Sequence, residues 1–114
     1  MNDVTDATFA TAVVERSNTV PVVVDLWAEW CGPCKTLGPI LETVIAETGG
    51  KVELAKVDVD SNPQTAQAFQ VQGIPAVYAL KDGKVVERWG NGDSLIIIRQ
   101  LGLDVDLSLQ LLEE

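Results

Sequence analysis

The most constraining feature of the sequence is a nearly unbroken apolar run at residues 20–27, VPVVVDLW. A strand that is covered on both faces needs such a run, because neither of its faces meets water. Pro21 cannot donate a hydrogen bond to a sheet, so we expect it at the start of the strand. The run therefore predicts a central, doubly covered strand.

Further apolar runs alternate with helix-like stretches, which is typical of βαβ units in an α/β fold. Strands are predicted at 52–59, 74–80 and 84–89, and Asp82-Gly83 is a turn-forming pair expected to join the last two in a hairpin. The predicted helices are one through Val14 capped by Asp6, one from the cysteines to Gly49 and Gly50, a short one opened by Ser61 and Pro63, and one at 95–101.

Length and charge limit the classes of function. A chain of 114 residues fits a single domain. Its net charge of -9 repels phosphate backbones and anionic membrane surfaces, so nucleic acid is a poor partner. No apolar stretch approaches the roughly 18 residues of a membrane span. Met1 to Asp6 is acidic and polar, unlike a secretory signal, so a cytoplasmic location is expected.

The chemistry of the chain is concentrated in residues 30–35, WCGPCK, at the predicted strand-to-helix junction. A thiol at a helix N-terminus faces unpaired N–H groups and the positive end of the helix dipole, which favour the thiolate. Cys31 is therefore predicted to be the nucleophile, and Cys34 can resolve the mixed disulfide that forms. Pro33 suits the first helical turn, and Gly32 allows a substrate backbone to come close.

Two other interpretations of the cysteine pair are zinc ligation and a purely structural disulfide. Structural zinc needs four ligands, whereas the chain has two cysteines and no histidine, so no metal is expected. A structural bridge across so short a loop would add little stability. Redox catalysis is the better explanation.

Asp25 interrupts the apolar run, where it would be buried behind the cysteines. Desolvation would raise its pKa toward the range in which it could accept and return the Cys34 proton. Lys56 interrupts another strand and could lie near it. The alternatives are a salt-bridged Asp25 and a Lys56 that points to solvent.

These residues together resemble the thioredoxin family, and the similarity extends from Phe9 to about Gly90. Its motifs are WCGPCK, the aspartate in VVDLWAEWCGPC, AKVDVD, GIPA and a glycine after the last strand. The resemblance implies a thioredoxin fold, a central mixed β-sheet flanked by helices. It also implies attack by Cys31, resolution by Cys34, and proton transfer tuned by Asp25 with Lys56.

The resemblance further implies a shallow substrate groove formed by Trp30, Ile74 and Gly90, beside Gly32 and Pro33. A proline that enters a strand is either a strand start or a cis residue, and the family pattern implies that Pro75 is cis and faces the disulfide. Protein disulfides are the implied substrates and a flavin-dependent thioredoxin reductase the electron donor. No bound cofactor is needed, and Gly-Pro between the cysteines favours a dithiol reductase.

Three departures from the family pattern bear on organisation. Met1 to Thr5 leaves little room for a first strand. Gly38 before Pro39 resembles thioredoxin domains fused to tetratricopeptide segments in co-chaperones, which makes a redox-linked client-binding module the alternative function. The third departure lies beyond Gly90, where the chain does not follow the usual ending of the family. We expect a thioredoxin domain at 1–102 and an atypical tail at 103–114.

The tail alternates apolar and polar residues between Leu103 and Leu111, as a strand would, although its leucines also suit a helix. We expect that it packs on its own domain, pairs between chains in self-association, or leads to a further domain. A frayed terminus is the remaining alternative.

Overall fold

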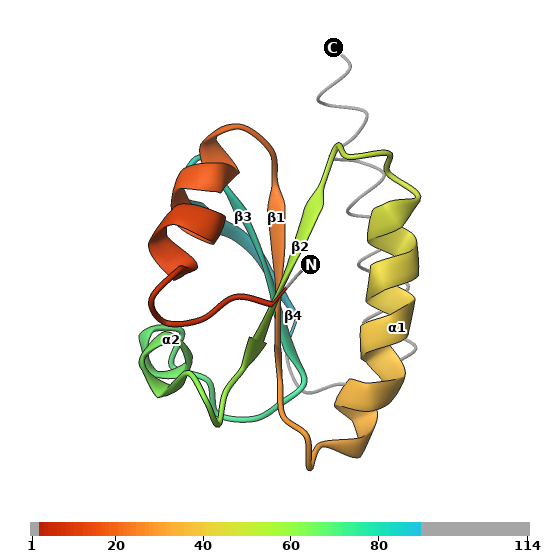
Figure 1. Cartoon of the computed structure of the whole chain (residues 1–114), viewed down its shortest axis with the longest axis vertical. Coiled ribbons are helices and arrows are strands. Elements are labelled where there is room, and N and C mark those ends of the chain that lie inside the picture. The colour runs from red at the N-terminus through yellow and green to blue at the C-terminus, as the bar shows by residue number, and fades with distance from the viewer. Residues whose placement is uncertain (1–2, 90–114) are drawn as a thin grey trace.

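A computed structural model of the chain describes residues 3–89, and a four-stranded sheet runs through the middle of this part (Figure 1). The strands are β1 (Val22–Trp27), β2 (Glu53–Asp58), β3 (Ala76–Lys81) and β4 (Lys84–Trp89), in the order β2-β1-β3-β4. β1 is parallel to β2 and antiparallel to β3, and β3 is antiparallel to β4. The sheet is mixed, as predicted.

Helices cover both faces of the sheet (Figure 1). One face carries α1 (Gly32–Ala46), and the other carries η1 (Ala10–Glu15), η2 (Arg16–Asn18) and α2 (Pro63–Ala68). Alternate β1 side chains therefore enter two cores: Val23 packs with Leu37 and Leu41 of α1, and Val24 packs in the opposite core. The double coverage explains why the strand is apolar at almost every position.

The long helix α1 follows its predicted pattern. Leu37, Leu41 and Ile45 recur every four residues and are buried against the sheet. Gly49 and Gly50 follow the end of the helix with φ of 66° and 90°, a region that glycine adopts at little cost. The residue pattern thus accounts for both the buried face of α1 and its end.

The first helix differs from its prediction. It is a π-helix, η1, continued by a 3₁₀ turn, η2, and its N-cap is Phe9. Thr5 organises the preceding turn, because its carbonyl accepts the Phe9 N–H at 2.9 Å and its own N–H donates to the Thr8 hydroxyl at 3.0 Å. The prediction that Asp6 caps this helix is therefore wrong.

The Asp6 carboxylate instead accepts hydrogen bonds from the start of α2. Its oxygens accept from the N–H groups of Gln64 (3.2 Å) and Thr65 (2.8 Å) and from the Thr65 hydroxyl (2.6 Å). The N-cap of α2 is Asn62, not Ser61 as predicted, while Pro63 occupies the first turn as expected. A carboxylate 58 residues earlier in the chain thus replaces the local cap.

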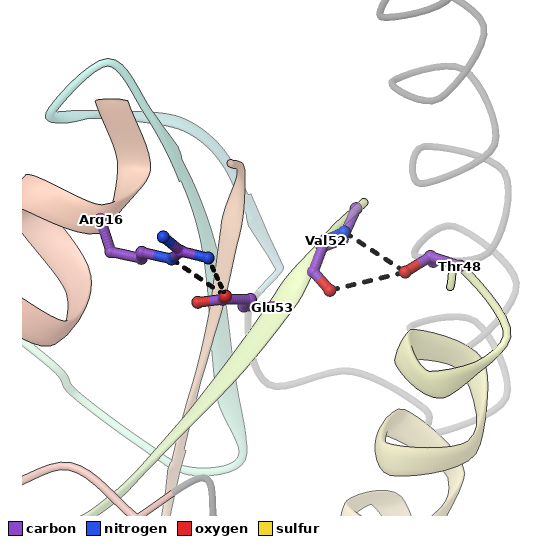
Figure 2. A network of polar contacts seen from close by, with 4 residues as sticks. All are labelled: Arg16, Thr48, Val52 and Glu53. Carbon is purple, nitrogen blue, oxygen red and sulfur yellow. Dashed lines mark hydrogen bonds and ion pairs between the residues drawn. The ribbon is translucent and has the colours of Figure 1, made fainter. Parts of the chain in front are cut away.

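Residues of two neighbouring segments make hydrogen bonds to the start of the edge strand β2 (Figure 2). The Arg16 guanidinium donates to Glu53 Oε1 at 2.7 and 2.9 Å, and the Thr48 hydroxyl accepts the Val52 N–H at 3.3 Å. From Asp3 onward, the family's first strand is reduced to one parallel bridge with Lys56, where Val4 N–H donates to the Lys56 carbonyl. The sequence prediction of a short or absent first strand is confirmed for these residues.

The Asp82-Gly83 hairpin is confirmed. Both residues have positive φ, 54° and 77°, as a tight turn between right-twisted strands requires. The predicted helix at 95–101, Gly90, the tail and the domain boundary after residue 102 lie outside the described residues. Within residues 3–89, no helix combines the length and the apolar character that a membrane crossing demands.

Candidate active site

Cys31 and Cys34 form a disulfide at the junction between β1 and α1, with their Cα atoms 5.3 Å apart. Cys31 is the N-cap of α1 in an extended conformation, and Pro33 lies in the first turn. The Cys34 N–H donates to the Cys31 sulfur at 3.3 Å. The predicted position of the cysteine pair at the start of the helix is therefore confirmed.

This geometry favours negative charge on Cys31. A capping side chain receives N–H groups that have no partner within the helix, and the positive end of the helix dipole points at it. In the reduced protein the same Cys34 N–H can stabilise the Cys31 thiolate. Both effects favour the thiolate form of a cysteine at this position.

The cysteines form a small apolar cluster with Ala28. The partly buried side chains that pack against it are those of Trp27, Val59 and Ile74. The Ile74–Pro75 peptide bond is cis, as the family resemblance implies. The site thus joins residues from the end of β1, the start of α1 and the loop before β3.

Asp25 lies in the middle of β1 and is 1% exposed. Among residues 3–89, neither of its carboxylate oxygens has a hydrogen-bond partner. Burial raises the pKa of Asp25 to about 6, an effect that the positive charge of Lys56 reduces and the negative charge of Glu42 reinforces. The predicted burial of Asp25 is confirmed, and the upward direction of its pKa agrees with the sequence prediction.

Lys56 lies opposite Asp25 in the β1–β2 register, but its ammonium group turns to another carboxylate. Lys56 Nζ donates to Glu42 Oε1 at 3.3 Å and lies 5.4 Å from the centroid of the Trp27 ring. The side chain is 20% exposed. Lys56 therefore neither points freely into solvent nor bonds to Asp25.

Trp30 stands out from the surface beside the disulfide with 70% of its area exposed. Its indole N–H donates to Asp60 Oδ2 at 2.9 Å, which orients the ring. Gly32 and Pro33 are exposed in the first turn of α1, whereas Gly90 lies outside the described residues. Within that described part, no group of three or more metal-binding side chains occurs.

Two polar residues of this region escaped the sequence analysis. Glu42 is an exposed glutamate on α1, and nothing in its local pattern marks it as the partner of Lys56. Asp60 ends the AKVDVD motif, but its bond to Trp30 spans 30 positions. Only the packing of α1 and the loop after β2 brings these carboxylates to the site.

Comparison with known proteins adds independent evidence. The thioredoxin family model matches residues 1–100. The thioredoxin of Mycobacterium tuberculosis is 52% identical over 85 residues, which cover 75% of this chain and 72% of that protein. Similar proteins include the bifunctional thioredoxin reductase/thioredoxin of Mycobacterium leprae, 45% identical over 86 residues that cover 75% of this chain and 18% of that protein.

A mitochondrial thioredoxin of Bos taurus is 49% identical over 73 residues, which cover 64% of this chain and 44% of that protein. The mixed sheet, the cysteine pair at the start of α1 and these similarities agree with one another. The chain therefore belongs to the thioredoxin family and is a thiol-disulfide oxidoreductase with Cys31 and Cys34 as its redox pair.

Proposed function

We propose that this protein is a dithiol reductase of protein disulfides. The observation that carries the proposal is the position of Cys31, which caps α1 and receives the Cys34 N–H at 3.3 Å. This position makes Cys31 the better thiolate of the pair and hence the attacking sulfur.

The reaction transfers two electrons in two exchanges. The Cys31 thiolate attacks one sulfur of the substrate disulfide, forms a mixed disulfide and expels the other substrate sulfur as a thiolate, which takes up a proton. Cys34 then loses its proton and attacks the Cys31 sulfur. The mixed disulfide breaks, the second substrate sulfur leaves as a thiolate that takes up a proton, and the Cys31–Cys34 bond remains.

Asp25 is the proposed acceptor of the Cys34 proton, and Lys56 tunes it. A pKa near 6 supports this role, because a base works best when its pKa is close to the working pH. The two carboxylate oxygens of Asp25 also support the role of proton acceptor, because neither of them accepts a hydrogen bond from any group among residues 3–89.

The substrate is proposed to bind as an extended segment along Trp30, Gly32, Pro33, Ile74, Pro75 and Gly90. The exposure of Trp30 and the packing of Ile74 against the cysteine cluster support this surface. Backbone pairing of such a segment depends little on side chains, which suits a reductase with many protein substrates.

A thioredoxin reductase is the proposed electron donor, in the cytoplasm. The Mycobacterium leprae relative, whose name joins a thioredoxin reductase and a thioredoxin, supports this donor. No resident cofactor is proposed, because the donor supplies the electrons and the cysteines carry them.

The first test is the reduction potential of the Cys31/Cys34 couple, measured in glutathione and dithiothreitol buffers by the fluorescence of Trp27 and Trp30. We expect a value of about -270 mV, the potential typical of a thioredoxin that works as a reductant. A potential of about -120 mV, typical of a strong oxidant, would contradict the reductase function.

A mixed-disulfide trap tests the order of the two thiols. Cys34→Ser should accumulate a covalent adduct between Cys31 and a model disulfide protein, because the resolving thiol is absent. Cys31→Ser should form no such adduct. Intact-protein mass spectrometry distinguishes the two variants, and an adduct on Cys34 of the Cys31→Ser protein would reverse the assigned roles.

A client-binding module of a tetratricopeptide co-chaperone is the second candidate, suggested by Gly38 before Pro39. The curated relatives, which are named as thioredoxins, favour the reductase. Suppression of client aggregation by a protein with both Cys31→Ser and Cys34→Ser would support the module, because this function would not need the thiols.

A further inference from the structure

The Lys56 ammonium group could face either of two carboxylates. Lys56 and Asp25 are direct partners in the β1–β2 register, so the lysine side chain starts beside the buried carboxyl group. In the structure its Nζ bonds to Glu42 on α1 at 3.3 Å, and both oxygens of Asp25 are without hydrogen-bond partners among residues 3–89.

The Lys56 ammonium group lies against α1, beside Gly38 and Glu42. Gly38 and Glu42 are four residues apart, on one face of the helix. A Cβ atom on Gly38 would lie 3.4 Å from Lys56 Nζ, so the glycine leaves room for the ammonium group. The ammonium group also lies 5.4 Å from the centroid of the Trp27 ring.

The charged groups that act on Asp25 come from two elements. β2 contributes Lys56 and α1 contributes Glu42. The strand β3 places Val77, an apolar residue, opposite Asp25. Asp58 at the end of β2 engages the Asp60 N–H and the Ser61 hydroxyl instead.

We propose that Glu42 is a positioning residue of the redox site, which holds the Lys56 ammonium group against α1 and so keeps it from neutralising Asp25. Glu42 touches neither the sulfurs nor the substrate and acts through Lys56. Its kinetic consequence rests on the proposed role of Asp25 as the proton acceptor for Cys34.

The test is the Glu42→Gln variant, with the titration of the Asp25 carboxyl carbon followed by ¹³C NMR in the oxidised protein. Without the Glu42 charge, the repulsion that raises the pKa of Asp25 is lost and Lys56 can turn toward it. Both changes lower the pKa of Asp25, and we expect a fall of about 1 unit, the low end of what an adjacent opposite charge produces.

Two further variants separate positioning from other effects. Glu47→Gln, the same change at the exposed C-cap of α1, is the matched control and should leave the Asp25 titration in place. In a Lys56→Met background, Glu42→Gln should shift the titration by much less, because no ammonium group remains to move. An equal shift in both backgrounds, or no shift at all, would overturn the proposal.

The pH profile of disulfide reduction provides a second readout. Its lower limb should move to lower pH in Glu42→Gln and stay in place in Glu47→Gln. If the titration shifts but the pH profile does not, the role of Asp25 in the proposed function fails while the positioning by Glu42 stands. If the titration itself is unmoved, the positioning fails whatever the activity.

Discussion

Asp25 is the residue at which stability and chemistry conflict. A carboxyl group that is 1% exposed and has no hydrogen-bond partner in the described part of the chain is costly to ionise. The raised pKa, about 6 against an ordinary 3.8, expresses this cost. The neutral form stabilises the fold fully below pH 3.8, and this stability is lost as the pH rises through about 6.

Asp25→Asn should therefore stabilise the protein at alkaline pH. A shift from 3.8 to about 6 corresponds to about 3 kcal/mol, so we expect the free energy of unfolding at pH 8 to rise by about 2 to 3 kcal/mol. The gain should shrink as the pH falls and vanish below about pH 4. Urea unfolding at several pH values measures it, and a gain independent of pH would refute the explanation.

Among the secondary-structure elements, α2 depends most clearly on a distant residue. The helix spans only Pro63–Ala68, and its own N-cap, Asn62, makes no side-chain capping bond. Asp6 accepts the N–H groups of Gln64 and Thr65 and so connects the segment before η1 to the helix. The hydrogen bonds from Thr65 and Gln64 lower the pKa of Asp6.

Asp6→Ala should loosen the start of α2. We expect faster hydrogen exchange at the Gln64 and Thr65 amides and a lower melting temperature at pH 7. Because the folded pKa is lowered, the stabilisation is present above pH 3.8 and is lost as the pH falls through the lower value. Asp3→Ala, at an exposed position nearby, is the control and should leave both amides protected.

Ser17 joins η2 to the β3–β4 hairpin. Its buried hydroxyl accepts the Gly83 N–H at 2.8 Å and donates to the Val14 carbonyl at 2.6 Å, while its own carbonyl accepts the Asp82 N–H at 2.9 Å. Two hydrogen bonds to Ser17 therefore hold the hairpin turn against the helix, and the bond to Val14 fixes the serine hydroxyl.

Ser17→Ala should destabilise the protein by about 1 to 3 kcal/mol, because the Gly83 N–H loses its acceptor in a partly buried place. The denaturant midpoint measures the loss. Thr19→Ala, two residues on at an exposed position, should change the midpoint little, and equal losses in the two variants would argue against the hydrogen bonds as the cause.

At the scale of the whole molecule, the redox site depends on the layered fold. β1 leads directly into the start of α1, and Val59 after β2 and Ile74 before β3 pack against the cysteines, so segments far apart in sequence meet at the sulfurs. Glu42 reaches Lys56 only because α1 packs across β2 (Figure 1). The acid–base behaviour of the site therefore depends on the packing of α1 on the sheet.

The segment 103–114 lies outside the described residues, and its role stays a prediction. We propose that its apolar side chains are buried against this domain or against a second copy of the chain. Removal of residues 103–114 should then lower the melting temperature or reduce the mass in solution. Removal of Glu113 and Glu114 alone is the control, and unchanged mass and melting in both would dismiss the proposal.

The sequence by itself determined the features that depend on neighbouring residues. Apolar runs identified the strands, the four-residue recurrence of Leu37, Leu41 and Ile45 identified the buried face of α1, and Asp82-Gly83 identified the hairpin. The same local logic located the cysteine pair at a helix N-terminus. These predictions succeed because periodicity, capping and turn conformation act over a few residues.

The tertiary structure alone decided which polar groups meet. In the sequence Asp6 resembles the N-cap of the first helix, but its carboxylate accepts hydrogen bonds from the start of α2. Lys56 binds Glu42, although the family pattern pairs it with Asp25. The π-helical form of η1 was also not predicted. Hydrogen bonds and ion pairs between distant residues depend on how the helices pack on the sheet, and local pattern carries no information on that packing.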